Sequence, residues 1–223
     1  SDWKFKEPNR HEVHDTFQTL IMARRLGITP PRPLHRICIP ERIEEIASDL
    51  WEKYRFGEAV SMFPHSSNPV KDWGKDRYIS LGRMLLEKGL KVLLFGGPNQ
   101  MKELQDMAAS MGSGAYVPYL LSGLSFDDEL YLCMALLKRS ALAISGDSGG
   151  AHLSAALGTK TLVISLLSRI NKFMPLGERV WSVYPDIECS PCPARDMKVC
   201  SGQRWCAAGI TPQILCEAVT LLL

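Results

Sequence analysis

Short apolar runs of strand length alternate with amphipathic stretches of helix length from residue 59 onward. The apolar runs predict six strands, at residues 59–63, 91–95, 115–119, 141–145, 161–166 and 180–184. Apolar residues recur at helical spacing between them and predict helices at about 75–88, 100–111, 126–138 and 150–157. Such alternation is typical of parallel strands joined by right-handed crossovers. The pattern therefore predicts an α/β fold, a Rossmann-like parallel sheet with helices on both faces.

The start of the chain breaks this alternation. Residues 10–26 have the pattern of a helix, and the segment Thr29-Pro30-Pro31-Arg32-Pro33 then stops it, because proline cannot continue a helix. A second helix is predicted at 41–54, just before the alternating region. We therefore predict two regions, a helix and linker at 1–40 and one α/β domain at 41–223.

Composition adds little to this picture but argues against several classes of partner. The chain has 223 residues, 46% of them hydrophobic and 22% charged, with a formal net charge of +2. So small a net charge predicts no nucleic-acid partner and at most peripheral membrane contact. The sequence holds no apolar run of the ~18 residues that a spanning helix needs, and its start lacks the pattern of a signal peptide. We therefore expect a cytoplasmic protein.

Four of the seven cysteines crowd into a Cys-rich loop at residues 189–206, namely Cys189, Cys192, Cys200 and Cys206. Zinc and iron sites favour four sulfur ligands, so the loop is a candidate structural metal site. The spacing of the second pair is irregular for a zinc ribbon. Buried thiols and one or two disulfides are the competing interpretations, and the odd total of cysteines favours a reducing compartment.

Polar and small residues follow the first two predicted strands, at the edge of the sheet where this architecture binds ligands. Ser66, Ser67 and Lys71 come after the first strand, and two hydroxyls with one lysine suit a diphosphate. A glycine pair ending at Gly97 comes after the second strand and is followed by Gln100. Paired glycines allow a ligand to approach the backbone closely. Taken alone, each segment is equally typical of an ordinary solvated turn.

The segment after the fourth predicted strand, Gly146-Asp147-Ser148-Gly149-Gly150-Ala151-His152, is the most informative in the chain. Small residues at the start of a helix leave its backbone amides open to an anion, and the helix dipole adds to the attraction. His152 falls one turn into the helix, where it either lines the same crevice or fills the core. We therefore predict an anion-binding helix start here.

A serine hydrolase is a remote alternative for the same segment. Gly146-x-Ser148-x-Gly150 fits the nucleophile-elbow spacing, and a strand followed by a helix is its usual context. In that fold the triad histidine follows the serine, but His152 is the one downstream histidine and lies only four residues on, in the same helix. The sequence therefore argues against Ser148 as a nucleophile.

In this order and spacing, these segments resemble glycosyltransferase family 9, the ADP-heptose:lipopolysaccharide heptosyltransferases of the GT-B fold. The matching stretches are Pro64-His65-Ser66-Ser67, Lys71-Asp72-Trp73, Leu94-Phe95-Gly96-Gly97-Pro98, Leu121-Ser122-Gly123-Leu124-Ser125, Asp147 to Gly158, and the cysteine-rich tail. The resemblance implies the C-terminal, donor-binding half of such an enzyme. Residues 1–40 are then a remnant of its N-terminal domain.

The resemblance also implies roles at a nucleotide diphosphate sugar such as ADP-heptose. Lys71 and His152 would stabilise the leaving group as catalytic residues, and Asp147 would face the sugar hydroxyls. The other residues implied to bind the substrate are Ser66, Ser67, Gly97, Gln100, Ser148, Gly149 and Gly150. Gln100 stands where the family usually has a glutamate that contacts the nucleoside, so the nucleotide preference stays open.

The implied reaction is inverting transfer of a sugar, with heptose the first candidate, to a lipopolysaccharide-core or other saccharide acceptor. It needs a base on the acceptor hydroxyl and stabilisation of the departing nucleoside diphosphate. The residues named above meet the second need without a cofactor. A missing N-terminal domain, with the acceptor site and an aspartate base, is therefore an expected partner. The competing class is a non-catalytic nucleotide-binding or scaffold Rossmann module.

Overall fold

The computed structural model of the chain describes residues 15–29, 37–66, 68–122, 124, 126–166, 170–185, 187, 200 and 205–223. Three of the predicted site residues, Ser67, Cys189 and Cys192, lie outside these ranges. The elements below are those of the described residues.

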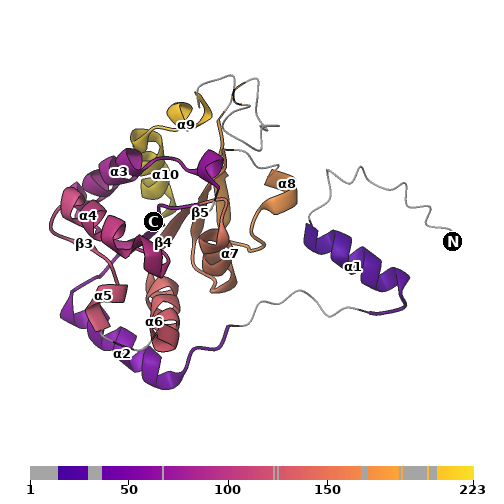
Figure 1. Cartoon of the computed structure of the whole chain (residues 1–223), viewed down its shortest axis with the longest axis horizontal. Coiled ribbons are helices and arrows are strands. Elements are labelled where there is room, and N and C mark those ends of the chain that lie inside the picture. The colour runs from indigo at the N-terminus through magenta and orange to yellow at the C-terminus, as the bar shows by residue number, and fades with distance from the viewer. Residues whose placement is uncertain are drawn as a thin grey trace.

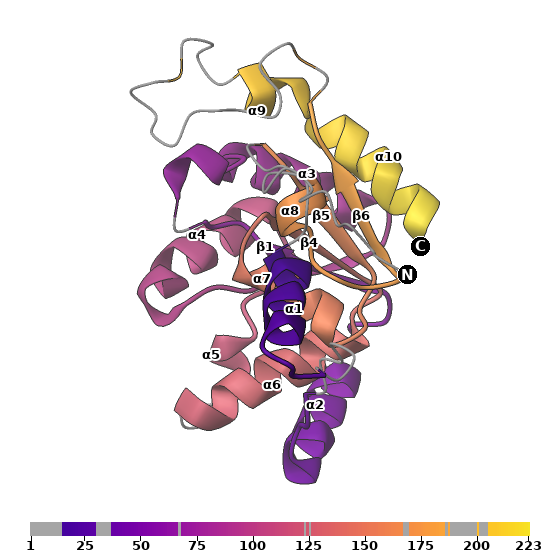
Figure 2. The same cartoon turned by 90° about the vertical axis from the view of Figure 1, so that its right-hand side faces the viewer.

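Six parallel strands form one sheet in the order β3-β2-β1-β4-β5-β6. They are Ala59–Phe63 (β1), Lys91–Leu94 (β2), Ala115–Tyr116 (β3), Leu142–Gly146 (β4), Thr161–Ile164 (β5) and Val180–Val183 (β6). The chain first builds outward from β1 to β3 and then returns to add β4, β5 and β6 on the other side of β1. Figure 2 labels β1 and the three strands of this second half. The order reverses between β1 and β4, which is where folds of this type bind ligands.

Helices cover both faces of the sheet (Figure 1). One layer consists of α3 (Lys75–Glu87), α4 (Met101–Met111) and α10 (Pro212–Leu222). The other consists of α2 (Glu41–Lys53), α6 (Phe126–Arg139) and α7 (Gly149–Ala156). Short helical turns complete the described chain at Pro69–Lys71 (η1), Pro98–Gln100 (η2), Tyr119–Ser122 (α5), Ile170–Phe173 (α8) and Trp205–Gly209 (α9). The predicted Rossmann-like sheet with helices on both faces is confirmed.

Alternation along each strand explains the two layers. Val60 and Met62 of β1 pack into the cluster under α3, α4 and α10, whereas Ala59 packs into the cluster under α2 and α6. Successive side chains of a strand point to opposite faces, so apolar residues at every position predict burial on both sides. Ser61 is the exception in β1, and its buried hydroxyl hydrogen-bonds to that of Ser140 at 2.6 Å.

The third strand is shorter than predicted. A strand was expected at 115–119, but β3 ends at Tyr116 and α5 begins at Tyr119. Pro118 lies between them, and proline has no backbone N–H to donate to a neighbouring strand. This edge of the sheet is therefore short, and the chain turns away from it early.

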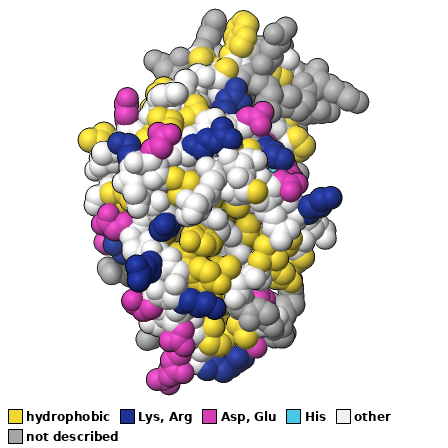
Figure 3. Space-filling model, turned by 90° about the vertical axis from the view of Figure 1, so that its left-hand side faces the viewer, with side chains coloured by type: hydrophobic (Ala, Val, Ile, Leu, Met, Phe, Trp, Pro, Cys, Tyr) yellow, Lys and Arg dark blue, Asp and Glu magenta, His cyan; other side chains and the backbone are white. Residues whose placement is uncertain are grey.

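The first helix, α1 (Asp15–Arg25), stands apart from the sheet and its covering helices (Figure 1). Its Met22 is 63% exposed, and Leu26 just beyond it is also exposed. A boundary near residue 40 is compatible with this arrangement but stays a prediction. No helix in the described part of the chain has the length and apolar character to cross a membrane. On the face drawn in Figure 3, basic side chains are interspersed with acidic and hydrophobic ones.

Candidate functional site

A cavity of about 350 Å³ opens where β1, β2 and β4 end. Helices α6 and α7 close it from the side. Its lining is mostly apolar, with a few polar groups, and comprises Phe63, His65, Phe95, Gly96, Gly97, Gln100, Leu130, Cys133, Leu137, Ser148, Gly149, Gly150 and Leu153. Five of the predicted site residues therefore line one cavity: Gly97, Gln100, Ser148, Gly149 and Gly150.

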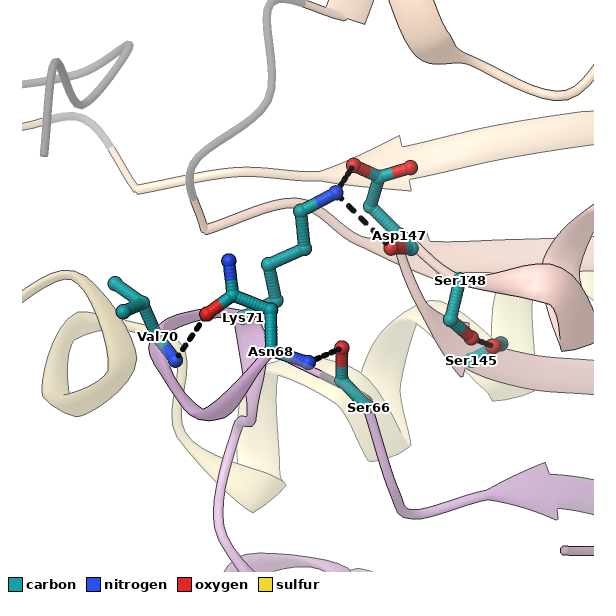
Figure 4. A network of polar contacts seen from close by, with 7 residues as sticks. All are labelled: Ser66, Asn68, Val70, Lys71, Ser145, Asp147 and Ser148. Carbon is teal, nitrogen blue, oxygen red and sulfur yellow. Dashed lines mark hydrogen bonds and ion pairs between the residues drawn. The ribbon is translucent and has the colours of Figure 1, made fainter. Parts of the chain in front are cut away.

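The start of α7 is open toward this cavity. Ser148 is the N-cap residue, but its side chain makes no capping hydrogen bond and pairs with the Ser145 hydroxyl at 3.0 Å instead (Figure 4). The first amides of a helix have no partner within it. Among the described residues nothing hydrogen-bonds the amides of Gly149 and Gly150. They are thus available to an anion, and the helix dipole favours negative charge there.

Both glycines at this helix start have distinct surroundings. A Cβ on Gly150 would lie 2.4 Å from the Phe63 ring, so only glycine lets the helix approach β1 this closely. A Cβ on Gly149 would meet nothing within 4 Å. Packing therefore requires the second glycine, whereas the first borders open space.

Lys71 and Asp147 form an ion pair beside the same helix start (Figure 4). The Lys71 Nζ lies 2.7 Å from the Asp147 Oδ2 and 3.4 Å from its carbonyl oxygen. The Asp147 side chain is 8% exposed and that of Lys71 is 30% exposed. A carboxylate this buried needs a charged partner, so Lys71 balances the charge of Asp147, the residue directly before the start of α7.

The turn that carries Lys71 is held by its own side chains (Figure 4). The Asn68 Oδ1 accepts a hydrogen bond from the Val70 N–H at 3.0 Å, and the Ser66 Oγ accepts one from the Asn68 N–H at 3.3 Å. Pro69 starts the turn η1, where its fixed φ suits a helical first position. The hydroxyl of Ser66 is thus already used in shaping the turn.

Gln100 folds back over the turn after β2. Its Oε1 accepts a hydrogen bond from the Gly97 N–H at 2.8 Å. A Cβ on Gly96 would lie 2.6 Å from that same oxygen, so the glycine makes room for the side chain. The amide nitrogen of Gln100 is left to face a ligand as a hydrogen-bond donor.

His152, like Ser66, Lys71 and Asp147, is a predicted site residue that does not line the cavity. It lies on the exposed side of α7 and is not among the residues that line the cavity. Ser148, four residues earlier, has φ −150° and ψ 176°, which is ordinary extended backbone. A nucleophile elbow holds its serine in a strained turn. The local geometry therefore gives no support to a serine hydrolase.

The part of the chain that the structure describes gives the zinc or iron interpretation of the cysteines no support. No group of three or more metal-ligating side chains occurs within it. Cys200 and Cys206 are half-buried there, and the other two candidate ligands, Cys189 and Cys192, lie outside it.

Two buried titratable groups border the site and stay neutral. Burial raises the pKa of Cys133 to about 12, helped by the nearby carboxylate of Glu129, so this cavity residue is a thiol and not a nucleophile. Burial also raises the pKa of Tyr78 far above its usual range, and the charge of Asp72 adds to the effect. The backbone of Gly146, at the end of β4, lowers the pKa of Tyr78 and offsets part of this rise.

Sequence reasoning missed much of the cavity wall. Phe63 and Phe95 stack at 5.3 Å between ring centroids, and three α6 side chains close the opposite side, namely Leu130, Cys133 and Leu137. These residues have the pattern of ordinary core, and only packing in three dimensions shows that they border a cavity. His65 was also left out of the predicted site, although its position directly after β1 is a signal that sequence offers.

Residues 2–200 match the sequence profile of Glycosyltransferase family 9 (heptosyltransferase). No curated protein sequence is similar enough to the chain to count as a match. A solved family 9 glycosyltransferase from Veillonella parvula has a TM-score of 0.75 and 21% identity, covering 96% of this chain and 61% of its own.

Two heptosyltransferases from E. coli are similar in the same way. ADP-heptose lps heptosyltransferase II has a TM-score of 0.65 and 18% identity, covering 87% of this chain and 55% of its own. Heptosyltransferase WaaC with ADP has a TM-score of 0.62 and 16% identity, covering 95% of this chain and 57% of its own. At these identities the likeness shows a shared fold. The chain spans little more than half the length of either enzyme.

Proposed function

The chain belongs to glycosyltransferase family 9, and on that premise we propose that it binds the nucleotide diphosphate sugar from which a glycosyl group is transferred. One observation carries the proposal: the uncapped start of α7 and the Lys71 ammonium lie together beside a mostly apolar cavity. Phosphates bind at such helix starts, and a cavity of this size suits a nucleoside.

The residue roles follow from that arrangement. The groups assigned to the diphosphate are the Lys71 ammonium, the amides of Gly149 and Gly150, and the hydroxyls of Ser66, Ser67 and Ser148. Gly97 and Gln100 lie at the nucleoside end, where the Gln100 amide nitrogen is a donor. Asp147 uses its Oδ2 to hold Lys71, and its Oδ1 is assigned to the sugar hydroxyls.

The sugar and nucleotide are proposed from the solved relatives. One WaaC structure is described with ADP and another with ADP-2-deoxy-2-fluoro heptose. We take ADP-heptose as the first candidate substrate and a lipopolysaccharide-core or related saccharide as the acceptor. We propose the cytoplasm as the compartment of this transfer.

The chemistry assigned to this chain is stabilisation of the leaving nucleoside diphosphate. Negative charge grows on the leaving phosphate as the glycosidic bond breaks, and preorganised N–H groups and a lysine stabilise it without a metal. His152 joins this set only from the solvent side of α7. Inversion also needs a base on the acceptor hydroxyl, and we assign the acceptor site and that base to a facing domain. Residues 1–40 are then its remnant in this sequence.

A scaffold without catalytic function is the alternative class. A scaffold would not need the Lys71 charge, the Asp147 carboxylate or the open start of α7. All three lie within one small region although Lys71 and Asp147 are 76 positions apart in sequence. That convergence favours a working anion site over a decayed one.

Calorimetry with ADP tests the proposal. We expect Lys71→Ala to raise the Kd about tenfold to 100-fold, because a charge-assisted contact contributes about 1.5–3 kcal/mol. Lys138→Ala is the matched control, since Lys138 forms a similar pair with Glu44 at 2.9 Å away from the cavity. An equal effect of both variants, or no binding of ADP, UDP or GDP by the unaltered chain, contradicts the proposal.

A further inference from the structure

His65 is one of the residues that line the cavity of the candidate site. It follows β1, which lies between β2 and β4 in the sheet. It lines the cavity together with Gln100 on one flank and Ser148 on the other. Its side chain is 14% exposed. Any nucleotide that spans from the Gln100 turn to the start of α7 therefore passes over this imidazole.

One nitrogen of the ring is sealed inside the protein. The His65 Nε2 is buried and has no hydrogen-bond partner within the described residues. Its nearest acceptor is the Glu103 Oε2 at 3.7 Å, beyond the usual limit for a hydrogen bond. The Glu103 side chain is 46% exposed and can move, so a small rotation brings it into contact with Nε2. An unpaired buried donor is unfavourable, which drives that rotation.

The other ring nitrogen, Nδ1, is not among the buried atoms that lack a partner, and it belongs to a side chain that lines the cavity. We therefore take Nδ1 as the nitrogen that meets a ligand. A carboxylate at Nε2 keeps the proton there, because an ionised carboxylate only accepts hydrogen bonds. Nδ1 of neutral His65 is then an acceptor. A second proton on the ring turns Nδ1 into a donor, from which an anionic ligand in the same cavity can accept a hydrogen bond.

Resting on the proposed function, we propose that His65 contacts the bound nucleotide through Nδ1, that Glu103 positions it, and that the affinity for the nucleotide rises as the pH falls. The sign follows from charge, since an anionic ligand favours the protonated ring. Other charged groups nearby are Lys75, 3.8 Å from the Glu103 Oε1, and the Lys71–Asp147 pair. Lys75 is 44% exposed and opposes the effect weakly. Gln100 and Cys133 complete the surroundings as neutral groups.

Calorimetry with ADP from about pH 6 to about pH 8.5 tests this inference, with His65→Gln beside the unaltered chain. ADP itself gains a proton in this range, so the quantity compared is the ratio of the two affinities at each pH. We expect the unaltered chain to bind about tenfold more tightly near pH 6 and within about twofold near pH 8.5. A ratio that stays constant with pH overturns the role of His65.

Glu103→Gln tests the positioning residue, and Glu87→Gln on the exposed end of α3 is its control. Removing the carboxylate should move the rise in affinity to lower pH, whereas the control should leave it in place. A purely structural role for Glu103 would change the melting temperature but not this pH profile. Glu103 is exposed, so its substitution should not disturb folding. The Glu103→Gln variant therefore still tests the pH dependence of ADP binding if His65→Gln lowers stability. If ADP does not bind to the unaltered chain at any pH, the proposed function is contradicted. If ADP binds and the pH profile is unaltered in both variants, only this inference is contradicted.

Discussion

Two helices of this domain begin in opposite ways. At the start of α10 the Thr211 hydroxyl accepts a hydrogen bond from the Ile214 N–H at 3.3 Å, and Pro212 occupies the first position, which needs no N–H. At the start of α7 the serine in the same position, Ser148, turns its hydroxyl to Ser145 and leaves the helix uncapped. Both helices have a hydroxyl side chain at the N-cap position, but only the hydroxyl of Thr211 caps its helix.

The difference separates a helix start that is capped within the chain from one that we propose binds a ligand. Capping α10 satisfies its donors within the chain, while Leu215 and Val219 anchor it in the core. A cap on α7 would fill the position that an anion needs. Leaving it open gives up about 1 kcal/mol of stability, the usual contribution of an N-cap. The comparison therefore supports the proposed anion site at the start of α7 without reference to any relative.

The largest expected effect comes from adding a side chain where α7 packs closely against β1. Gly150→Ala places a methyl group against the Phe63 ring, 2.4 Å away before any adjustment. We expect the free energy of unfolding to fall by about 1–3 kcal/mol, as for other overpacked sites, and ADP binding to be lost with the displaced helix start. Urea denaturation and calorimetry measure the two effects.

Gly149→Ala is the control for that variant, because its new methyl group meets nothing within 4 Å. Stability should be unchanged or slightly raised, since alanine favours a helix more than glycine by about 1 kcal/mol. A similar loss of stability in both variants would show that the clash with Phe63 is not the cause.

The next effect comes from giving α7 the cap that it lacks. Ser148→Asp places a carboxylate where the N-cap side chain and a phosphate would compete. We expect the Kd for ADP to rise at least about tenfold while the free energy of unfolding does not fall. Thermal unfolding and calorimetry on the same samples check both parts.

Two variants show whether that result is specific to the open start. Thr211→Ala should lower stability by about 1 kcal/mol and leave ADP binding unaltered, because α10 already has its cap. Ser148→Asn supplies an uncharged cap and should weaken ADP less than the aspartate does. Equal affinities for ADP in Ser148→Asp and the unaltered chain would mean that the phosphates bind elsewhere.

The smallest effect is expected at the ion pair. Asp147→Asn leaves Lys71 beside the helix start and removes the carboxylate assigned to the sugar. We expect the Kd for ADP to change less than about threefold, because loss of the partner and gain of net positive charge act in opposite directions. Binding of ADP-heptose should weaken more than binding of ADP. A large loss of ADP itself would instead mean that Asp147 is needed to hold Lys71 in position.

Much of the fold was predictable because the signals were local. The apolar run of β1 was predicted at its observed bounds, and the helix that starts within the anion segment was displaced by one residue, since α7 begins at Gly149. The failure at β3 was also local, because Pro118 carried the information that ends the strand. Family membership was predictable from the order of short segments and is confirmed by the match to residues 2–200.

The site was predictable only in outline. Small residues at a helix start predicted an anion-binding segment, but the Lys71–Asp147 pair depends on strand order, and the α6 wall depends on packing. Neither has a periodic signature in the sequence. The individual roles assigned to Lys71, His152 and the glycines stay predictions until binding is measured.

The unequal surroundings of the two glycines in α7 also determine how the sequence of this segment would diverge during evolution. Phe63 forbids a side chain at Gly150 whether or not a nucleotide is bound, so folding alone preserves that residue. Gly149 borders open space, so packing does not require a glycine there, and under the proposed function the ligand does. In a lineage that abandons nucleotide binding, Gly149 is free to vary early while Gly150 persists. A glycine at position 150 therefore indicates that the fold is kept, and the residue at position 149 is the better marker of retained nucleotide binding.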